Sequence, residues 1–505
     1  MLPAGVAWVV TILLLSFPDL MLPVAIGDWI VAAGLMVVAQ LGFTRDSASR
    51  ARSILVTSAV TCAAVGMIAT SALAMSGSRR PQVLAESKSV SAATIVTTQT
   101  AVPGGRYFAA TITEVDGESV SVPVLVFGAA PASRVEIGTA LQIDGSLTAT
   151  TPSDEVSFLV FARGPGRLVA QPPWYLGWAN GLRSGFARAS GSLPGDGGEL
   201  LPGLAIGDTS AVSPQLNSAM KASSLTHLTA VSGANCAVVI GLILLVGRAV
   251  GLSRGLRVAA ALVVLVGFVV LVTPQPSVLR SAIMAALVLG TLASGRPVNG
   301  LPVVGVTVLV LLAIDPWLAV DYGFALSVLA TAGLMALTSP IARRLEIFLP
   351  HWLSLLVAVP VAAQLACQPV LVLLNPSLPL YGVLANALAE PASPIATVVG
   401  LLACVALPLF PALGSLLAAI AWVPAAWIAS VAVFFAGLPG ARLPWPGGFL
   451  GATGFTAVTA GILLVIVARV SRRWRVGVGL AAIALVGVMM TCAAVVPGIG
   501  VAPAA

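Results

Sequence analysis

The sequence predicts a polytopic α-helical membrane protein that carries a small all-β barrel outside the membrane. Of its 505 residues, 58% are hydrophobic and only 9% are charged, whereas soluble domains usually carry about 25% charged residues. A soluble core of this size could not hide so much apolar surface, so most of the chain faces lipid. Within residues 82–171 the long apolar runs give way to short alternating ones, which indicates strands.

Three apolar runs open the chain, at residues 4–16, 24–43 and 54–75. The loop between the second and third runs is basic, so we expect it to lie in the cytoplasm and the third run to lead outward. The first run has no basic head and no convincing cleavage site, so we expect it to be retained as a span. Residues 1–81 are therefore predicted to form N-terminal transmembrane helices.

The segment 82–171 is predicted to fold as a small extracytoplasmic β domain. Valines occupy every second position from 120 to 126, as one buried face of a strand would. Asp116-Gly117 just before them is a hairpin signal, and the same period recurs in residues 138–147 and 158–162. Four or five short strands suit a barrel, although periodicity alone does not choose between several small β folds.

This β domain is poorly equipped to grip DNA, because its acidic residues outnumber its basic ones and its aromatic residues are few. We therefore expect a structural or gating domain. Residues 172–221 follow as an interfacial linker rich in aromatic residues and arginine, and Ser213-Pro214 predicts the start of a helix there. The residues that indicate the interface are Trp174, Tyr175, Trp178, Arg183 and Arg188.

From residue 222 to the end the chain is predicted to stay in the membrane, as a channel domain (222–440) and C-terminal helices (441–505). The basic clusters between its apolar runs should face the cytoplasm. Residues 379–394 are bounded by prolines and predict a re-entrant or broken helix. The candidate spans are residues 222–246, 258–272, 277–293, 301–314, 319–337, 352–374, 392–409, 413–435, 452–467 and 476–494.

Residues 226–236, THLTAVSGANC, place polar groups at the start of one predicted span. Helical spacing would bring His227, Ser232 and Asn235 towards one face, with a possible kink at Ser232-Gly233. Such groups are costly in hydrocarbon unless they bond to a neighbouring helix or line a wet cavity, and we favour the lining.

Further candidates for lining or gating a channel are charged. Arg280 opens a span and is either a cation at a pore mouth or a snorkelling interface residue. Asp321 opens another span, where it could cap the helix or pair with Arg280. Asp208, Lys221 and Glu390 complete the set.

No enzyme, cofactor or metal site is predicted on this chain. It has two histidines and five cysteines, and the cysteines lie in apolar runs without CxxC spacing, so they read as small buried residues. Ser232 has no nucleophile-elbow motif and no evident acid partner. A Walker A sequence is also missing.

Four short sequences, taken in order, resemble the ComEC competence family: Gly-Asp at 207–208, residues 226–236, PSVLR at 276–280 and DYGFALS at 321–327. The resemblance implies a multi-pass channel in the bacterial cytoplasmic (inner) membrane that takes up single-stranded transforming DNA during natural competence while the other strand is degraded. It also implies an OB-fold insert outside the membrane, an extracytoplasmic DNA-receptor protein and a cytoplasmic helicase-like ATPase.

The chain departs from the family pattern at three places. Asn235 stands where the family has a second histidine, so chemistry that needs two histidines is in doubt, and Ala325 replaces a common glutamine. Many relatives add a C-terminal metallo-β-lactamase-like domain, whose His-x-His-x-Asp-His sequence does not occur here. Strand degradation, if it occurs, would then require another protein or a further part of this gene product.

Two other functions are compatible with the sequence. One is a secondary transporter of a small anionic solute, which a broken helix at 379–394 would suit. The other is a scaffold without a transport role. A passive DNA conduit driven by a separate ATPase is the favoured hypothesis, and it needs a hydrated path about 10 Å or more across, by comparison with groove dimensions.

Overall fold

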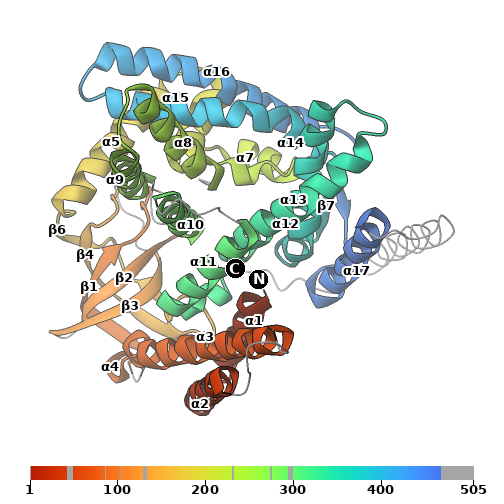
Figure 1. Ribbon diagram of the computed structural model, residues 1–505. Coiled ribbons are helices and arrows are strands. Elements are labelled where there is room, and N and C mark those ends of the chain that lie inside the picture. Colours follow the sequence, from red (N-terminus) through yellow and green to blue (C-terminus); the bar gives the residue numbers. More distant parts are fainter. Residues whose placement is uncertain are drawn as a thin grey trace. The chain divides into compact units, whose positions relative to one another are not determined.

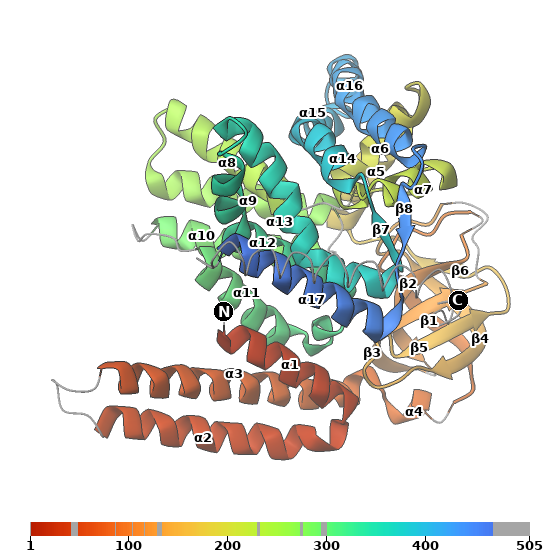
Figure 2. The same ribbon diagram turned by 90° about the vertical axis from the view of Figure 1, so that its right-hand side faces the viewer.

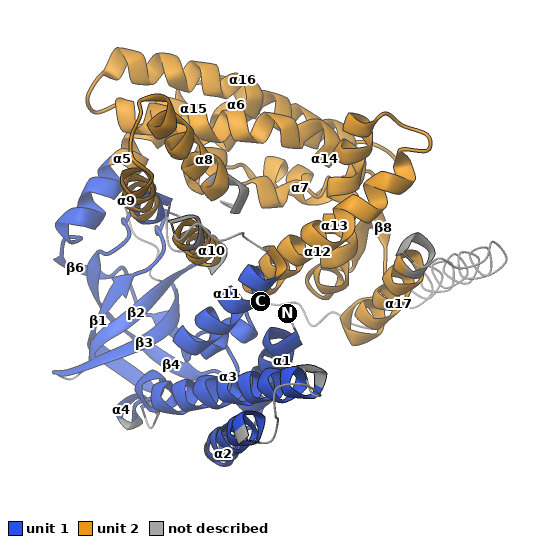
Figure 3. Cartoon of the chain, viewed as in Figure 1, with its two compact units in different colours: residues 1–181, 267–276, 302–321 blue, residues 182–266, 277–301, 322–505 orange. Residues whose placement is uncertain are grey.

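The computed structural model describes residues 2–41, 49–85, 87–103, 105–115, 117–128, 134–229, 233–272, 276–293 and 300–467. The chain divides into two compact units, coloured separately in Figure 3. Unit 1 comprises Met1–Gly181, Gly267–Pro276 and Pro302–Asp321, and unit 2 comprises Leu182–Val266, Ser277–Leu301 and Tyr322–Ala505.

Unit 1 begins with three apolar helices, α1 (Leu2–Ser16), α2 (Met21–Leu41) and α3 (Ser49–Arg79), with α2 lying along α3 (Figure 2). The Trp29 indole donates to Thr70 Oγ1 at 3.3 Å. Over the whole chain, within the described ranges, seven helices are long and apolar enough to cross a bilayer. The prediction of a multi-pass membrane protein is confirmed.

The β domain of unit 1 is a closed barrel (Figure 1). The sheet order is β1-β2-β3-β5-β4-β6, and a β1–β4 pairing closes it. β3 and β5 run parallel while the other neighbours are antiparallel, which is the Greek-key arrangement of an OB barrel. The strands are β1 (Ser89–Thr97), β2 (Tyr107–Val115), β3 (Glu118–Phe127), β4 (Ala140–Ala149), β5 (Phe158–Ala162) and β6 (Arg167–Ala170).

The alternating valines form the barrel core as predicted. Val122, Val124 and Val126 are fully buried, and Phe158 and Val160 of β5 pack in the same cluster. Each such side chain stabilises the fold by about 1.5–3 kcal/mol on burial. Sequence periodicity located β3, β4 and β5; β1 carries a register shift near its middle, which blurs its period of two.

Arg79, at the end of α3, joins three parts of unit 1. It pairs with Asp315 (3.5 Å), covers the Trp317 ring (4.1 Å to the centroid) and donates to the Glu155 carbonyl at 3.3 Å. Trp317 lies in the 3-10 turn η3 (Pro316–Ala319) and donates its indole N–H to the Pro152 carbonyl. The β4–β5 loop of the barrel is thus held to α3 and η3 by Arg79.

Unit 2 is helical apart from a short β7–β8 pair. Its elements begin with the rest of α5 (Trp174–Gly191), then α6 (Gly195–Ile206), α7 (Pro214–Ala222), η2 (Thr226–Leu228), α8 (Gly233–Ala249), α9 (Arg254–Val272) and α10 (Pro276–Ala293). After α11 (Gly300–Ile314), most of which belongs to unit 1, come α12 (Tyr322–Leu345), α13 (His351–Leu374), β7 (Ser377–Pro379), α14 (Gly382–Ala389), η4 (Glu390–Ala392), α15 (Ser393–Ala406), α16 (Pro411–Ala436), β8 (Arg442–Pro444) and α17 (Gly448–Val467).

Several expectations about unit 2 need correction. The single span predicted at 222–246 is wrong, because the chain leaves the helix after α7 and starts again at α8. The span predicted at 319–337 starts later and runs on to Leu345. Arg183, assigned to the membrane interface, is instead buried, with 2% of its surface exposed. The span predicted at 476–494 lies outside the described residues.

The helix start predicted at Ser213-Pro214 is confirmed, because Ser213 caps α7 by accepting from the Leu216 N–H. Trp174 and Trp178 are largely exposed, and their place at a membrane interface remains a prediction. In the segment 379–394 the 3-10 turn η4 separates α14 from α15, but the backbone stays right-handed helical there and Gly382–Ala406 forms one 25-residue apolar helix instead of the predicted re-entrant or broken one.

Replacement of Arg79 with alanine is expected to lower the unfolding free energy of the full chain by about 2 kcal/mol, since an ion pair and a cation–π contact are lost. Thermal unfolding of the purified protein would measure this. Arg79→Lys should recover only part of the loss, because lysine lacks the planar group that stacks on Trp317. Equal stability of all three proteins would contradict this role.

Burial raises the pKa of the Glu155 carboxyl above its ordinary value, and the nearby carboxylates of Asp321 and Asp315 raise it further. The Arg79 guanidinium acts in the opposite direction and lowers this pKa. The folded chain therefore gains stability as pH falls through this raised pKa. At neutral pH the ionised Glu155 carboxylate lowers the unfolding free energy. Glu155→Gln should stabilise the chain at pH 7, by at most about 0.5 kcal/mol because Glu155 is exposed. The gain should vanish towards pH 4.5. A stability gain that grows on acidification would contradict this prediction. Glu118 is exposed, so Glu118→Gln serves as the control variant.

Candidate functional site

The turn after α7 holds a serine in a left-handed conformation. Ser224 has φ +62°, and the Leu225 and Ser224 N–H groups bond back to the Met220 and Lys221 carbonyls at 2.8 and 3.3 Å. These two bonds define a Schellman motif, in which glycine is usual because a Cβ is strained there by about 1–2 kcal/mol. The motif turns the chain sharply before the His227 segment.

The Ser224 carbonyl is where the polar groups of this region meet. His227 Nδ1 lies 3.1 Å from it and Asn386 Nδ2 of α14 lies 3.4 Å from it. A carbonyl can only accept, so Nδ1 is the ring nitrogen that donates in this contact.

His227 Nε2 faces Glu390, with 3.9 Å between Nε2 and the Glu390 carboxylate. Glu390 begins η4, the 3-10 turn between α14 and α15. The side chains are 53% and 30% exposed, so the pair is open to water. The contact links the His227 turn to η4.

The surroundings of this pair are closely packed and polar. Asn386 is 6% exposed, and its Oδ1 has no hydrogen-bond partner among the described residues. A Cβ on Gly382 would lie 3.2 Å from Ser224 Cβ and 3.4 Å from Gln364 Oε1, so glycine permits the close approach of α14 to the Ser224 turn. We call the set Ser224, His227, Asn386 and Glu390 the break cluster.

A second polar centre surrounds Arg280 on α10, which is 4% exposed. Its Nη1 donates to Thr331 Oγ1 of α12 at 2.9 Å and approaches Met284 Sδ at 3.2 Å. Its Nη2 donates to Ser281 Oγ at 3.3 Å. The buried Cys236 of α8 lies close enough to interact electrostatically with it. A charge placed in a membrane helix costs about 2.5–3.5 kcal/mol by insertion scales.

The sequence therefore identified residues that the fold separates into two centres. His227 and Glu390, 163 positions apart in the sequence, are brought together; Arg280 belongs to the other centre. The expectation that His227, Ser232 and Asn235 share a helix is wrong, because His227 lies in η2 and α8 starts later, at Gly233. Ser232 lies outside the described residues, as does the side chain of Asn235.

The remaining candidates are dispersed. Lys221 is exposed on α7. Asp208 accepts from the Ser210 N–H at 3.0 Å after α6, as in an Asx turn. Asp321 belongs to unit 1 and Arg280 to unit 2, so their pairing remains a prediction. Sequence reasoning missed the Ser224 turn and Thr331; Ser at a helix end gave no signal of a left-handed turn.

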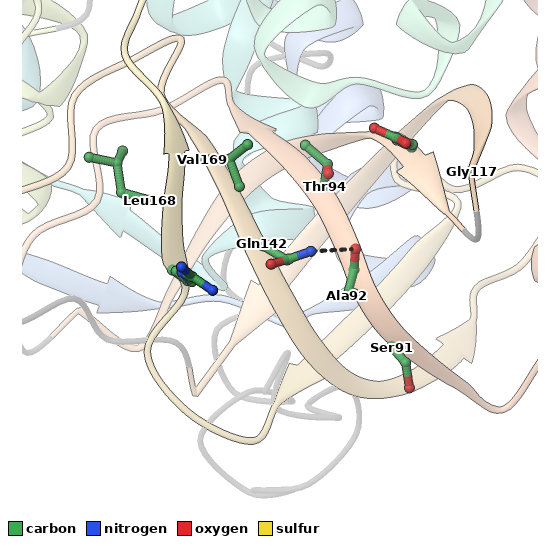
Figure 4. A pocket seen from close by; sticks show the side chains of 9 residues that line it. Ser91, Ala92, Thr94, Gly117, Gln142, Leu168 and Val169 are labelled. Carbon is green, nitrogen blue, oxygen red and sulfur yellow. Dashed lines mark hydrogen bonds between the residues drawn. The ribbon is translucent and has the colours of Figure 1, made fainter.

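The barrel presents a groove of about 600 Å³ along β1, β4 and β6 (Figure 4). Gln142 donates to the Ala92 carbonyl across it at 3.4 Å. Its charged lining consists of Glu114 and Arg167, and no aromatic side chain faces it. This lining lacks the basic and stacking groups that bind single strands.

Three of the few barrel aromatics instead form a ladder across neighbouring strands. Phe127 on β3 lies 5.6 Å from Tyr107 on β2 and 5.2 Å from Phe161 on β5, measured between ring centroids. Tyr107 and Phe161 are 55% and 44% exposed. Exposed rings of this kind can stack on bases. The ladder, and not the groove, is the part of the barrel suited to a strand.

Within the described ranges, no three His, Cys, Asp or Glu side chains gather as metal ligands would.

The strain at Ser224 can be tested directly. Ser224→Gly keeps the carbonyl that His227 and Asn386 contact and removes the strained Cβ, so it should raise the unfolding free energy by up to about 1 kcal/mol. Ser224→Val should lower it, because a β-branched residue disfavours positive φ. Thermal unfolding of the full chain measures both, and equal midpoints for the two variants would show that the turn is not left-handed.

Comparison with known proteins gives one match. A family model described as "Competence protein" matches residues 204–492, which is more than half of the chain. Searches of curated proteins and of solved structures return no match. The matched range contains both polar centres and starts after the barrel.

Proposed function

The chain belongs to the competence protein family, and from this premise we propose that it is the inner-membrane channel through which single-stranded DNA enters the cell. Family membership supports a role in competence DNA uptake. The bacterial cytoplasmic membrane is the proposed location, and the apolar helices fit a multi-pass protein there.

The observation that carries the proposal is the break cluster. The 3-10 turn η4 lies within the 25-residue apolar helix Gly382–Ala406, and a short 3-10 stretch inside a helix often marks a hinge. Glu390 begins this turn and faces the exposed His227 ring. The strained Ser224 turn and the Asn386 amide hold the two segments in contact. Rearrangement of this cluster would move this helix, which is how a gate in the path would act.

The proposed conduit is passive. No Walker A sequence and no hydrolytic triad supports catalysis by this chain, so the driving force is assigned to a cytoplasmic helicase-like ATPase. DNA would be delivered by an extracytoplasmic receptor protein, and the non-transported strand would be degraded by a nuclease on another protein or on a further part of this gene product. The exposed Tyr107–Phe127–Phe161 ladder offers the strand a stacking surface on the barrel.

The 3-10 turn within this helix also favours one alternative, a secondary transporter of a small anionic solute, because such transporters bind substrate at interrupted helices. The two functions differ in what crosses the membrane. Uptake of labelled single-stranded DNA supports the conduit, whereas uptake of a small anion without DNA supports the transporter.

The chain provides a matched control for the gate. His351 and Glu346 form a second His–Glu pair, at 2.7 Å, beside the turn between α12 and α13. In a competent host, His227→Ala should reduce transformants by up to about fivefold, as expected for loss of a water-exposed contact worth at most about 1 kcal/mol. His351→Ala should leave the count unchanged. Membrane abundance of each variant is followed by immunoblot.

Glu390→Gln should reproduce the His227→Ala defect, and the double variant should be no worse than either single one, because both changes remove the same contact. Undiminished transformation by both single variants at normal abundance would remove the break cluster from the mechanism.

A further inference from the structure

Among the described residues of its own unit, Arg280 has no carboxylate as a partner. The carboxylates of unit 2 all occupy other positions, and the undescribed residues of unit 2 contain no Asp or Glu. Four of these carboxylates contact their own neighbours and the fifth lines a groove beside α7 and α16. They are Glu199, Asp208, Glu346, Glu390 and Asp196.

The guanidinium is nevertheless deeply buried. With 4% of the residue exposed, it has lost most contact with water, and the positive end of the α10 dipole, near Pro276, adds to its charge. A buried charge is retained only where a partner compensates for it. Among the described residues, its contacts are with hydroxyl and sulfur atoms, which carry no opposite charge.

One edge of the guanidinium is incompletely hydrogen-bonded. Nη1 is engaged by Thr331, while Nε is buried without a partner among the described residues and Nη2 has only the long 3.3 Å bond to Ser281. Nε and Nη2 form the two parallel donors that a phosphate or carboxylate binds bidentately. The Ser281 hydroxyl lies on that same edge.

The site also joins three sequence segments of unit 2. Cys236 ends the 226–236 motif, Arg280 ends PSVLR, and Thr331 donates to the carbonyl of Ser327, the last residue of DYGFALS. That bond orients the Thr331 oxygen to accept from Arg280. The guanidinium is therefore held in place before any ligand arrives.

We infer that Arg280, with the hydroxyls of Ser281 and Thr331, is a buried subsite for a phosphate-ester anion. The inference rests on the proposed function in one respect: the DNA backbone is the favoured source of that anion. A lipid phosphate headgroup has the same chemistry and is the other source to be distinguished. The anion would bind the Nε–Nη2 edge and supply the missing negative charge.

The test uses the full chain in nanodiscs of zwitterionic lipid and measures fluorescence anisotropy of a labelled single-stranded oligonucleotide over a range of salt. Arg280→Gln should weaken binding about tenfold or more and lower the salt slope by about 0.7, the value for one phosphate contact. Arg280→Lys should be intermediate. A methylphosphonate oligonucleotide, which lacks backbone charge, should be insensitive to the change.

Arg248→Gln is the matched control, because Arg248 is exposed at the end of α8 and its removal changes net charge equally. It should leave affinity and slope unchanged. Nanodiscs that contain phosphatidylglycerol identify the source: if Arg280→Gln abolishes preferential retention of that lipid and leaves oligonucleotide binding intact, the anion is a headgroup.

Three outcomes would overturn the assignment or its premise. Identical affinities, salt slopes and lipid retention for wild type and Arg280→Gln would exclude the subsite and leave the proposed function standing. No oligonucleotide binding by the wild type would instead contradict the proposed function, and lipid retention alone would then decide the subsite. If Arg280→Gln and Asp321→Asn each lower the unfolding midpoint and the double variant restores it, Asp321 is the counter-ion and no ligand is needed.

Discussion

Hydrocarbon offers no partner for polar atoms, and this constraint governs the arrangement of the helices in this protein. Most of the chain is apolar, so the few polar groups on its helices must contact one another or water. Apart from Asn386 Oδ1, the polar groups of the break cluster find partners at the Ser224 carbonyl or are exposed to solvent, as His227 and Glu390 are. The hydroxyls of Thr331 and Ser281 bond only part of the Arg280 guanidinium, because its Nε has no partner among the described residues.

The two polar centres have different physical characters, and this difference gives them different roles in the account. The break cluster combines a left-handed turn, a 3-10 turn within a helix and a water-exposed His–Glu contact, and in the proposed function it is the segment that moves. The Arg280 centre is buried, with its side chain fixed by α12. A moving gate and a fixed anion site are both needed by a path for a polyanion through lipid.

Sequence reasoning identified the barrel and most spans because each depends on local periodicity. The alternating valines before Phe127 specify one strand whatever surrounds them. It failed where the backbone leaves a regular element. The apolar run around His227 satisfies a hydropathy window, but Ser224 adopts a left-handed turn that composition does not reveal. Likewise Arg183 is buried through tertiary packing, although its sequence neighbours resemble interface residues.

The sequence pointed to the ionisable members of the two polar centres, but not to their hydroxyl and backbone partners or to their grouping. An ionisable residue in an apolar run is a candidate by itself, which is why His227, Glu390 and Arg280 could be named from the sequence. Their division into two centres depends on contacts between positions far apart in the chain, such as that between α14 and the Ser224 turn. Long-range contacts of this kind leave no periodic signal.

The central claim is that a DNA strand crosses the membrane through this chain. Uptake of labelled DNA into a nuclease-resistant form, in a deletion strain with and without the gene restored, tests it most directly. The account predicts that the deletion abolishes resistant label and that the restored gene returns it. Equal amounts of resistant label in the deletion strain and in the restored strain would contradict it.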